Sequence, residues 1–140
     1  MKILKWIQLV MVMVFAEYLN AQNQMEVVIS GVKDDSGTII VGLFSDEESF
    51  LKKPIIGKTV KATQGKVIVV LEGIPEGTYG LSIIHDSNSN GALDSNFFGI
   101  PKEGFGFSND AMGTFGPPSF EKAKLVISNM TIINVVMRYM

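Results

Sequence analysis

The sequence contains no cysteine and only one histidine, His85. Disulfide frameworks, thiolate metal sites and cysteine nucleophiles are therefore excluded, and so are metal sites built from several histidines. Basic residues are also few: 12 Lys and Arg against 14 Asp and Glu give a net charge of −2, with no basic run. A nucleic-acid partner is not expected, because such proteins carry a basic patch or stripe.

Long hydrophobic runs are scarce as well, and the one that stands out lies at the N-terminus, from Trp6 to Ala16. It is shorter than the roughly 20 residues that a bilayer-spanning helix needs. Lys2 and Lys5 precede it, and Ala21 offers a cleavage site after it. This layout predicts a secretory signal peptide over residues 1–21, with a buried N-terminal helix as the alternative. We expect an exported protein, periplasmic or secreted, with no transmembrane segment after cleavage.

The remaining residues, 22–140, have the length of a single domain, and their pattern favours β structure. Apolar runs rich in β-branched residues alternate with turn-forming clusters and predict seven strands, at residues 25–32, 38–44, 59–63, 66–71, 78–85, 123–127 and 131–138. Val67 to Leu71 is apolar at every position, which is typical of a strand buried on both faces. Short strands with almost no helix predict an all-β fold, an antiparallel β-sandwich, with an OB-type barrel as the alternative.

A long segment without periodicity separates the strand ending at His85 from the strand starting near Lys122. Disordered segments are poor in aromatic residues, yet six of the nine phenylalanines lie here: Phe97, Phe98, Phe105, Phe107, Phe115 and Phe120. The sequence therefore predicts one long ordered loop. We expect the phenylalanines to pack as a small core over one end of the sandwich. The alternative is an exposed platform for a partner.

The start of this segment, from His85 to Asp94, resembles a metal-binding loop. Oxygen-bearing side chains at alternate positions, followed by a glycine, form the first half of an EF-hand-type calcium loop. The expected ligands are four side chains and one backbone carbonyl: Asp86, Asn88, Asn90, Asp94 and the carbonyl of Ala92. Gly91 would supply the sharp turn, and Leu93 would anchor the loop to the core.

Two departures weaken the calcium prediction. Phe97 stands where an EF-hand has its bidentate acid, and the loop lies between strands rather than helices. Only two carboxylates remain, so affinity would be weak unless Glu103 or Asp110 folds back to help. The alternative is a metal-free turn, because Asn and Asp side chains readily bond their own backbone.

Four stretches of the mature chain carry a resemblance to a known family. They are Gly77-Thr78-Tyr79-Gly80 with His85-Asp86-x-Asn88-x-Asn90-Gly91-x-Leu93-Asp94, then Gly99-Ile100-Pro101-Lys102-Glu103-Gly104-Phe105-Gly106-Phe107-Ser108-Asn109, and Phe115-Gly116-Pro117-Pro118-Ser119-Phe120. In these residues the chain resembles the exported bacterial family called domain of unknown function 2141. The resemblance implies an exported β-sandwich of the transthyretin or immunoglobulin kind, and it brings no established activity, substrate or catalytic residue.

Together these features predict an exported binding or structural module with a calcium-binding-like loop. Its partner would be an envelope or extracellular glycan, peptide or protein. The competing hypothesis is a cell-envelope, hydrolase-like enzyme using His85 with Asp86 and a serine, Ser82 or Ser108. Adjacent residues of a strand point to opposite faces, so His85 and Asp86 are poorly placed as a catalytic pair. We expect no catalytic residues, and a structural His85 that faces inward and bonds to the long loop.

Overall fold

The computed structural model describes Ile3 and residues 23–140. Apart from Ile3, the expected signal peptide over residues 1–21 lies outside the described residues. The strands are β1 (Asn23–Val32), β2 (Thr38–Phe44), β3 (Ile56–Lys61), β4 (Gly65–Ile74), β5 (Gly77–Asp86), β6 (Gly104–Phe107), β7 (Leu125–Ile127) and β8 (Met130–Val136). Two short helices, η1 (Ser108–Asp110) and α2 (Phe120–Ala123), lie between β6 and β7. In the part of the chain described, no helix is long and apolar enough to cross a membrane.

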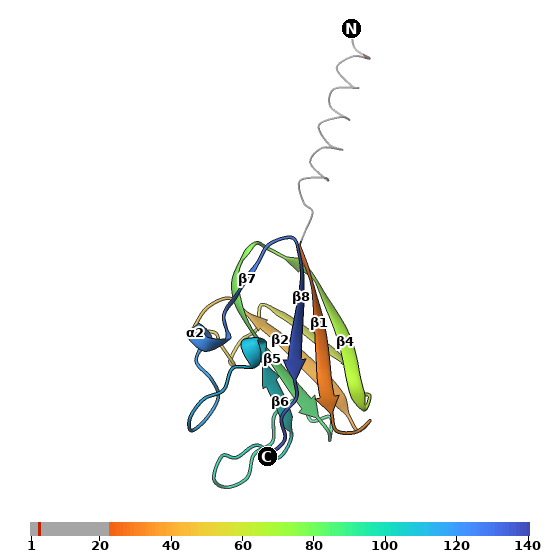
Figure 1. Cartoon of the computed structure of the whole chain (residues 1–140), viewed down its shortest axis with the longest axis vertical. Helices are drawn as coiled ribbons and strands as arrows, with labels where there is room; N and C mark the ends of the chain where they lie inside the picture. Colours follow the sequence, from red (N-terminus) through yellow and green to blue (C-terminus); the bar gives the residue numbers. More distant parts are fainter. Residues whose placement is uncertain (1–2, 4–22) are drawn as a thin grey trace.

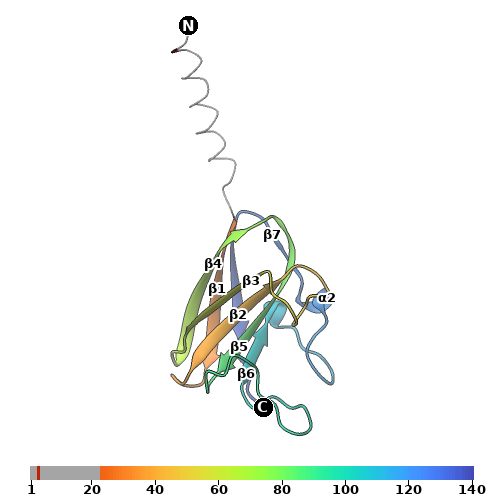
Figure 2. The same ribbon diagram turned by 180° about the vertical axis from the view of Figure 1, so that it is seen from behind.

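The strands form two sheets that pack face to face (Figures 1 and 2). One sheet has the order β4-β1-β8, and the other has the order β3-β2-β5-β6, with β7 paired to the start of β5. Among the described strands every pair is antiparallel except β1 and β8, which run parallel. The fold is therefore an all-β sandwich, as predicted, with eight strands in place of the expected seven.

The core lies between the sheets and follows the two-residue period of the strands. On β1, Met25, Val27 and Ile29 are completely buried, and the residues between them are partly exposed. On β5, Leu81 and Ile83 face the same interior. Burying such a side chain stabilises a fold by roughly 1.5–3 kcal/mol, so this alternation supplies most of the driving force for the sandwich.

The expectation that Val67–Leu71 is buried on both faces is wrong. β4 alternates: Val67, Val69 and Leu71 are buried, whereas the side chain of Ile68 is 54% exposed. The reason is that the three-stranded sheet is one layer of a sandwich, so one face packs on the core and the other meets solvent, where Ile132 of β8 is exposed as well. Apolar composition alone could not reveal that nothing in the described chain covers this face.

The long segment after β5 is only partly packed. It contains β6, an eighth strand, which pairs with β5 so that Gly104 lies opposite His85. Phe105 and Phe107 of β6 are buried in a second apolar cluster, against which Phe120 and Leu93 pack. The remaining three phenylalanines of the segment are strongly exposed: Phe97, Phe98 and Phe115. The expected small core is therefore correct for half of the phenylalanines and wrong for the other half.

Candidate metal centre

The candidate loop begins where β5 ends, at Asp86. Asp86 is 1% exposed, and its carboxylate accepts two backbone N–H groups, from Asn90 to Oδ1 at 3.1 Å and from Gly91 to Oδ2 at 2.7 Å. The chain can fold back so sharply because Ser89 and Gly91 adopt left-handed φ angles of 56° and 83°. Asp86 thus organises the turn by the Asx chemistry that the sequence suggested.

The turn preceding β2 packs directly against this start of the loop. Gly37 has a φ of 63°, and a Cβ atom placed on it would lie 2.0 Å from the backbone oxygen of Asp86. Only glycine fits both the conformation and the space. The position of Asp86 is therefore set from two sides, by its own strand and by the β1–β2 turn.

The other predicted side-chain ligands meet at Asp94. The Nδ2 atom of Asn88 lies 2.6 Å from Asp94 Oδ2, and the Nδ2 atom of Asn90 lies 2.9 Å from both carboxylate oxygens. The hydrogen bonds from Asn90, and then those from Asn88, lower the pKa of Asp94 below its ordinary value. The predicted ligand from Ala92 is its carbonyl, whereas the hydrogen bond that the structure shows for Ala92 is from its N–H to Asn90 Oδ1 at 3.0 Å. Four predicted ligands are thus brought into one compact loop.

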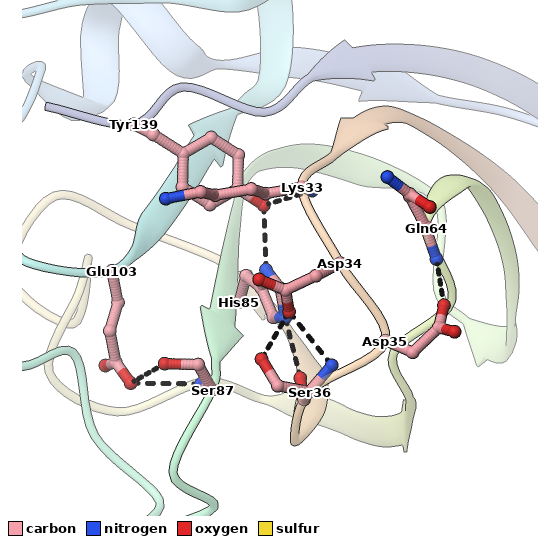
Figure 3. A network of polar contacts seen from close by, with 9 residues as sticks. All are labelled: Lys33, Asp34, Asp35, Ser36, Gln64, His85, Ser87, Glu103 and Tyr139. Atoms are coloured by element: carbon pink, nitrogen blue, oxygen red, sulfur yellow. Dashed lines mark hydrogen bonds and ion pairs between the residues drawn. The ribbon is translucent and has the colours of Figure 1, made fainter.

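Of the two acids considered as additional members of the loop, Glu103 and Asp110, only Glu103 folds back onto it. It is buried, and its Oε1 accepts both the N–H and the hydroxyl of Ser87 at 3.0 Å, while Oε2 accepts the N–H of Asp94 at 3.0 Å (Figure 3 shows the contacts with Ser87). Glu103 therefore ties the two ends of the loop together. Asp110 does not fold back, because its Oδ1 accepts the N–H of Val136 on β8 at 3.1 Å.

The oxygen donors of the loop are chemically compatible with a hard cation, which they would bind with modest affinity. Across the described residues, no three His, Asp or Glu side chains gather in a way that could hold a metal ion. A cation in this loop would therefore rely on two carboxylates, Asp86 and Asp94, together with amide and carbonyl oxygens. Turning an Asn amide by 180° exchanges its nitrogen and oxygen. Asn88 and Asn90 either donate to Asp94 or, after turning away from the N–H groups that their Oδ1 atoms accept, offer oxygens to Ca²⁺, which takes six to eight oxygen ligands.

His85 is a structural residue on this geometry, but its partners differ from those expected. It is 1% exposed and faces inward, as predicted. Its Nε2 lies 2.7 Å from the Ser36 carbonyl oxygen and its Nδ1 lies 2.7 Å from the Tyr139 hydroxyl, whereas the expectation was a bond to the long loop (Figure 3). Tyr139 was missed because nothing in its local sequence links it to a residue 54 positions away.

The hydrogen bonds of His85 determine its tautomer. A carbonyl oxygen only accepts, so Nε2 carries the proton and donates to Ser36. Nδ1 of the neutral ring then accepts a hydrogen bond from the Tyr139 hydroxyl. The Tyr139 oxygen in turn accepts a hydrogen bond from the backbone N–H of Lys33 at 3.0 Å. Both ring nitrogens are engaged away from solvent, so this arrangement does not favour His85 as a general acid or base.

The serines considered for catalysis are not brought to His85. Ser108 accepts the N–H of Leu81 at 3.0 Å and donates to the carbonyl oxygen of Ala123. Ser82 pairs with Phe107, three positions along β5 from His85. The enzyme hypothesis therefore gains no support from the described geometry.

The family described as "Uncharacterized protein conserved in bacteria (DUF2141)" matches residues 27–134. The matched range contains most of β1, all of β2 to β7, most of β8 and the entire candidate loop. No curated protein and no solved structure matches the chain.

Proposed function

The chain belongs to this family of uncharacterized bacterial proteins, and we propose that it is an exported β-sandwich module whose His85–Asp94 loop binds calcium. Export rests on the signal-like pattern of residues 1–21. The module acts by binding or as a structural element, in the periplasm or outside the cell. Its envelope or extracellular partner would be a glycan, peptide or protein.

The observation that carries the calcium proposal is the convergence of Asn88 and Asn90 on Asp94, beside a buried Asp86. The Nδ2 groups of both amides donate to Asp94, so turning these amides would direct their oxygens to the Asp94 carboxylate side, where they could join the carboxylates as hard ligands. The N–H groups of Asn90 and Gly91 use one acceptor site on each oxygen of the Asp86 carboxylate. Lone pairs remain for an ion, because a carboxylate offers about four acceptor sites.

The expected affinity is low. With two carboxylates in the loop, a dissociation constant of about 10⁻⁴ M is appropriate, in the range of extracellular calcium modules. At about 1 mM calcium, binding to the folded state alone would then stabilise it by about 1.4 kcal/mol. For a domain of this size that corresponds to a rise in Tm of about 5 °C.

Calcium titration with calorimetry tests the proposal. Wild type should gain about 5 °C on moving from chelator to calcium, and much less with magnesium, which demands near-ideal octahedral geometry. Asp86→Ala should abolish this calcium-dependent gain. Asp110→Ala is the matched control: it removes an acid that bonds β8 and should lower the starting Tm without changing the gain.

An identical Tm for wild type in calcium and in chelator would show that the loop is a metal-free Asx-rich turn. Equal gains in wild type and Asp86→Ala would place the ion elsewhere in the protein. Either result would contradict the proposed site.

A further inference from the structure

The loop between β5 and β6 ends in an apolar tip, Ser95–Pro101, which projects beyond the lower ends of the strands (Figures 1 and 2). Phe97 is 97% exposed, Phe98 is 83% exposed and Ile100 is 45% exposed. The two phenylalanine rings pack edge to face on each other, with centroids 5.6 Å apart. The largest apolar side chains of the tip thus contact solvent and one another instead of the core.

Most backbone N–H groups of the apolar tip are hydrogen-bonded within it. Asn96 Oδ1 accepts the N–H groups of Phe98 and Ile100 at 2.9 and 3.0 Å, and the Asn96 carbonyl accepts the N–H of Gly99 at 3.0 Å. The N–H of Asn96 itself donates to the Ile100 carbonyl at 2.9 Å, and Ser95 pairs with Pro101 at the base. The exposed rings are therefore presented by a closed turn that bonds the N–H groups of Asn96, Phe98, Gly99 and Ile100 within itself.

We propose that the apolar tip inserts into the surface of a lipid membrane. Apolar surroundings penalise unpaired backbone donors, and four of the five N–H groups from Asn96 to Ile100 are bonded within the tip. The tip also carries no charged side chain, and it projects beyond the ends of the strands, so it can reach a flat surface (Figure 1). A glycan or a polar peptide would gain nothing from this internal satisfaction of the backbone.

Charges at the base of the tip set the lipid preference. Asp86, Asp94 and Glu103 against Lys102 give the loop a formal charge of −2, which one Ca²⁺ ion would neutralise. Insertion into neutral lipid should therefore be insensitive to calcium, whereas binding to anionic lipid should improve when calcium is added. Only this second statement rests on the proposed calcium site.

Vesicle sedimentation with the exported form, as recovered from cells, tests the inference. The probes are phosphatidylcholine vesicles and mixed phosphatidylcholine–phosphatidylglycerol vesicles, each in calcium and in chelator. Phe97→Ser combined with Phe98→Ser should weaken partitioning by about 100-fold, since burying each ring is worth about tenfold or more. Ile68→Ser combined with Ile132→Ser is the matched control, because these exposed apolar residues lie on the sheet β4-β1-β8 and should not contribute.

A tryptophan at the tip gives an independent readout. Trp6 is the one tryptophan in the sequence, so the difference between Phe98→Trp and wild-type spectra isolates the tip. Its emission should shift to shorter wavelength with vesicles and be quenched by brominated lipid. No vesicle binding by wild type, or equal binding by the Phe97/Phe98 variant, would overturn the inference. Vesicle binding through the tip with no calcium effect on Tm would support the inference and reject the calcium site.

Discussion

His85 combines a buried polar ring with complete hydrogen bonding. Its two ring nitrogens connect the β1–β2 turn, through Ser36, to the C-terminal segment, through Tyr139. Because burying an unpaired polar group costs about 1–3 kcal/mol, full pairing is what makes a central histidine compatible with the core. The same pairs hold two chain segments that are far apart in sequence against β5.

Tyr139→Phe tests this connection and has a defined pH dependence. Loss of the hydroxyl should reduce the free energy of unfolding by about 1–2 kcal/mol near neutral pH, because Lys33 N–H and His85 Nδ1 both lose a partner. Burial raises the pKa of Tyr139 above its ordinary value of 10.0. A raised folded-state pKa means that this contribution is complete below pH 10 and is lost as pH rises through the folded pKa.

Urea unfolding of wild type and Tyr139→Phe between neutral pH and pH 11 measures the effect. The difference in unfolding free energy should stay constant up to about pH 10 and then shrink. A difference that stays constant to the highest pH would show that Tyr139 ionises equally in both states.

At the scale of elements, β6 explains why the long segment is partly ordered. Its sequence alternates glycine and phenylalanine, so one face carries Phe105 and Phe107 and the other carries no side chain. A Cβ atom on Gly104 would lie 2.4 Å from the Tyr139 ring, and one on Gly106 would lie 2.7 Å from Val135. The glycine face thus lets the C-terminal segment lie against β6, while the phenylalanine face fills the second apolar cluster.

Truncating single phenylalanines should affect stability differently in the packed and the exposed parts of the segment. Phe107→Ala removes a ring that is 7% exposed and should reduce the free energy of unfolding by about 3–5 kcal/mol. Phe97→Ala removes a ring that is 97% exposed and packs on the likewise solvent-facing Phe98, so it should change the free energy of unfolding by less than about 0.5 kcal/mol. Chemical denaturation of both variants measures this, and similar losses would mean that the tip packs on the sandwich in solution.

At the scale of the whole molecule, the described fold begins where the expected signal peptide ends. Asn23 is the first residue of β1, is 9% exposed, and donates from Nδ2 to the Ile74 carbonyl at 3.0 Å. Cleavage after Ala21 would leave Gln22 as the single residue before β1. Intact-mass analysis of the exported protein should therefore show a chain beginning at Gln22, and an exported form that retains Met1 would contradict the signal-peptide prediction.

Short-range chemistry allowed the sequence alone to predict the all-β class, most strand positions and the Asx-rich loop. The apolar, β-branched run over residues 25–32 and the spacing of Asp86, Asn88, Asn90 and Asp94 are properties of neighbouring residues, and the structure has a strand and a compact loop there. The inward direction of His85 followed from the two-residue period of its strand.

Long-range contacts decided the rest. The parallel pairing of β1 with β8, the exposure of Ile68 and the bond between His85 and Tyr139 depend on which distant segments meet. The six phenylalanines of the long segment divide for this reason too. Phe105 and Phe107 lie on a strand that pairs with β5, whereas Phe97 and Phe98 lie in a turn whose own hydrogen bonds close it away from the core. Both pairs are phenylalanines next to glycine, so residue type alone does not separate the buried pair from the exposed pair. The pairing of backbone groups across the fold decides which pair is buried.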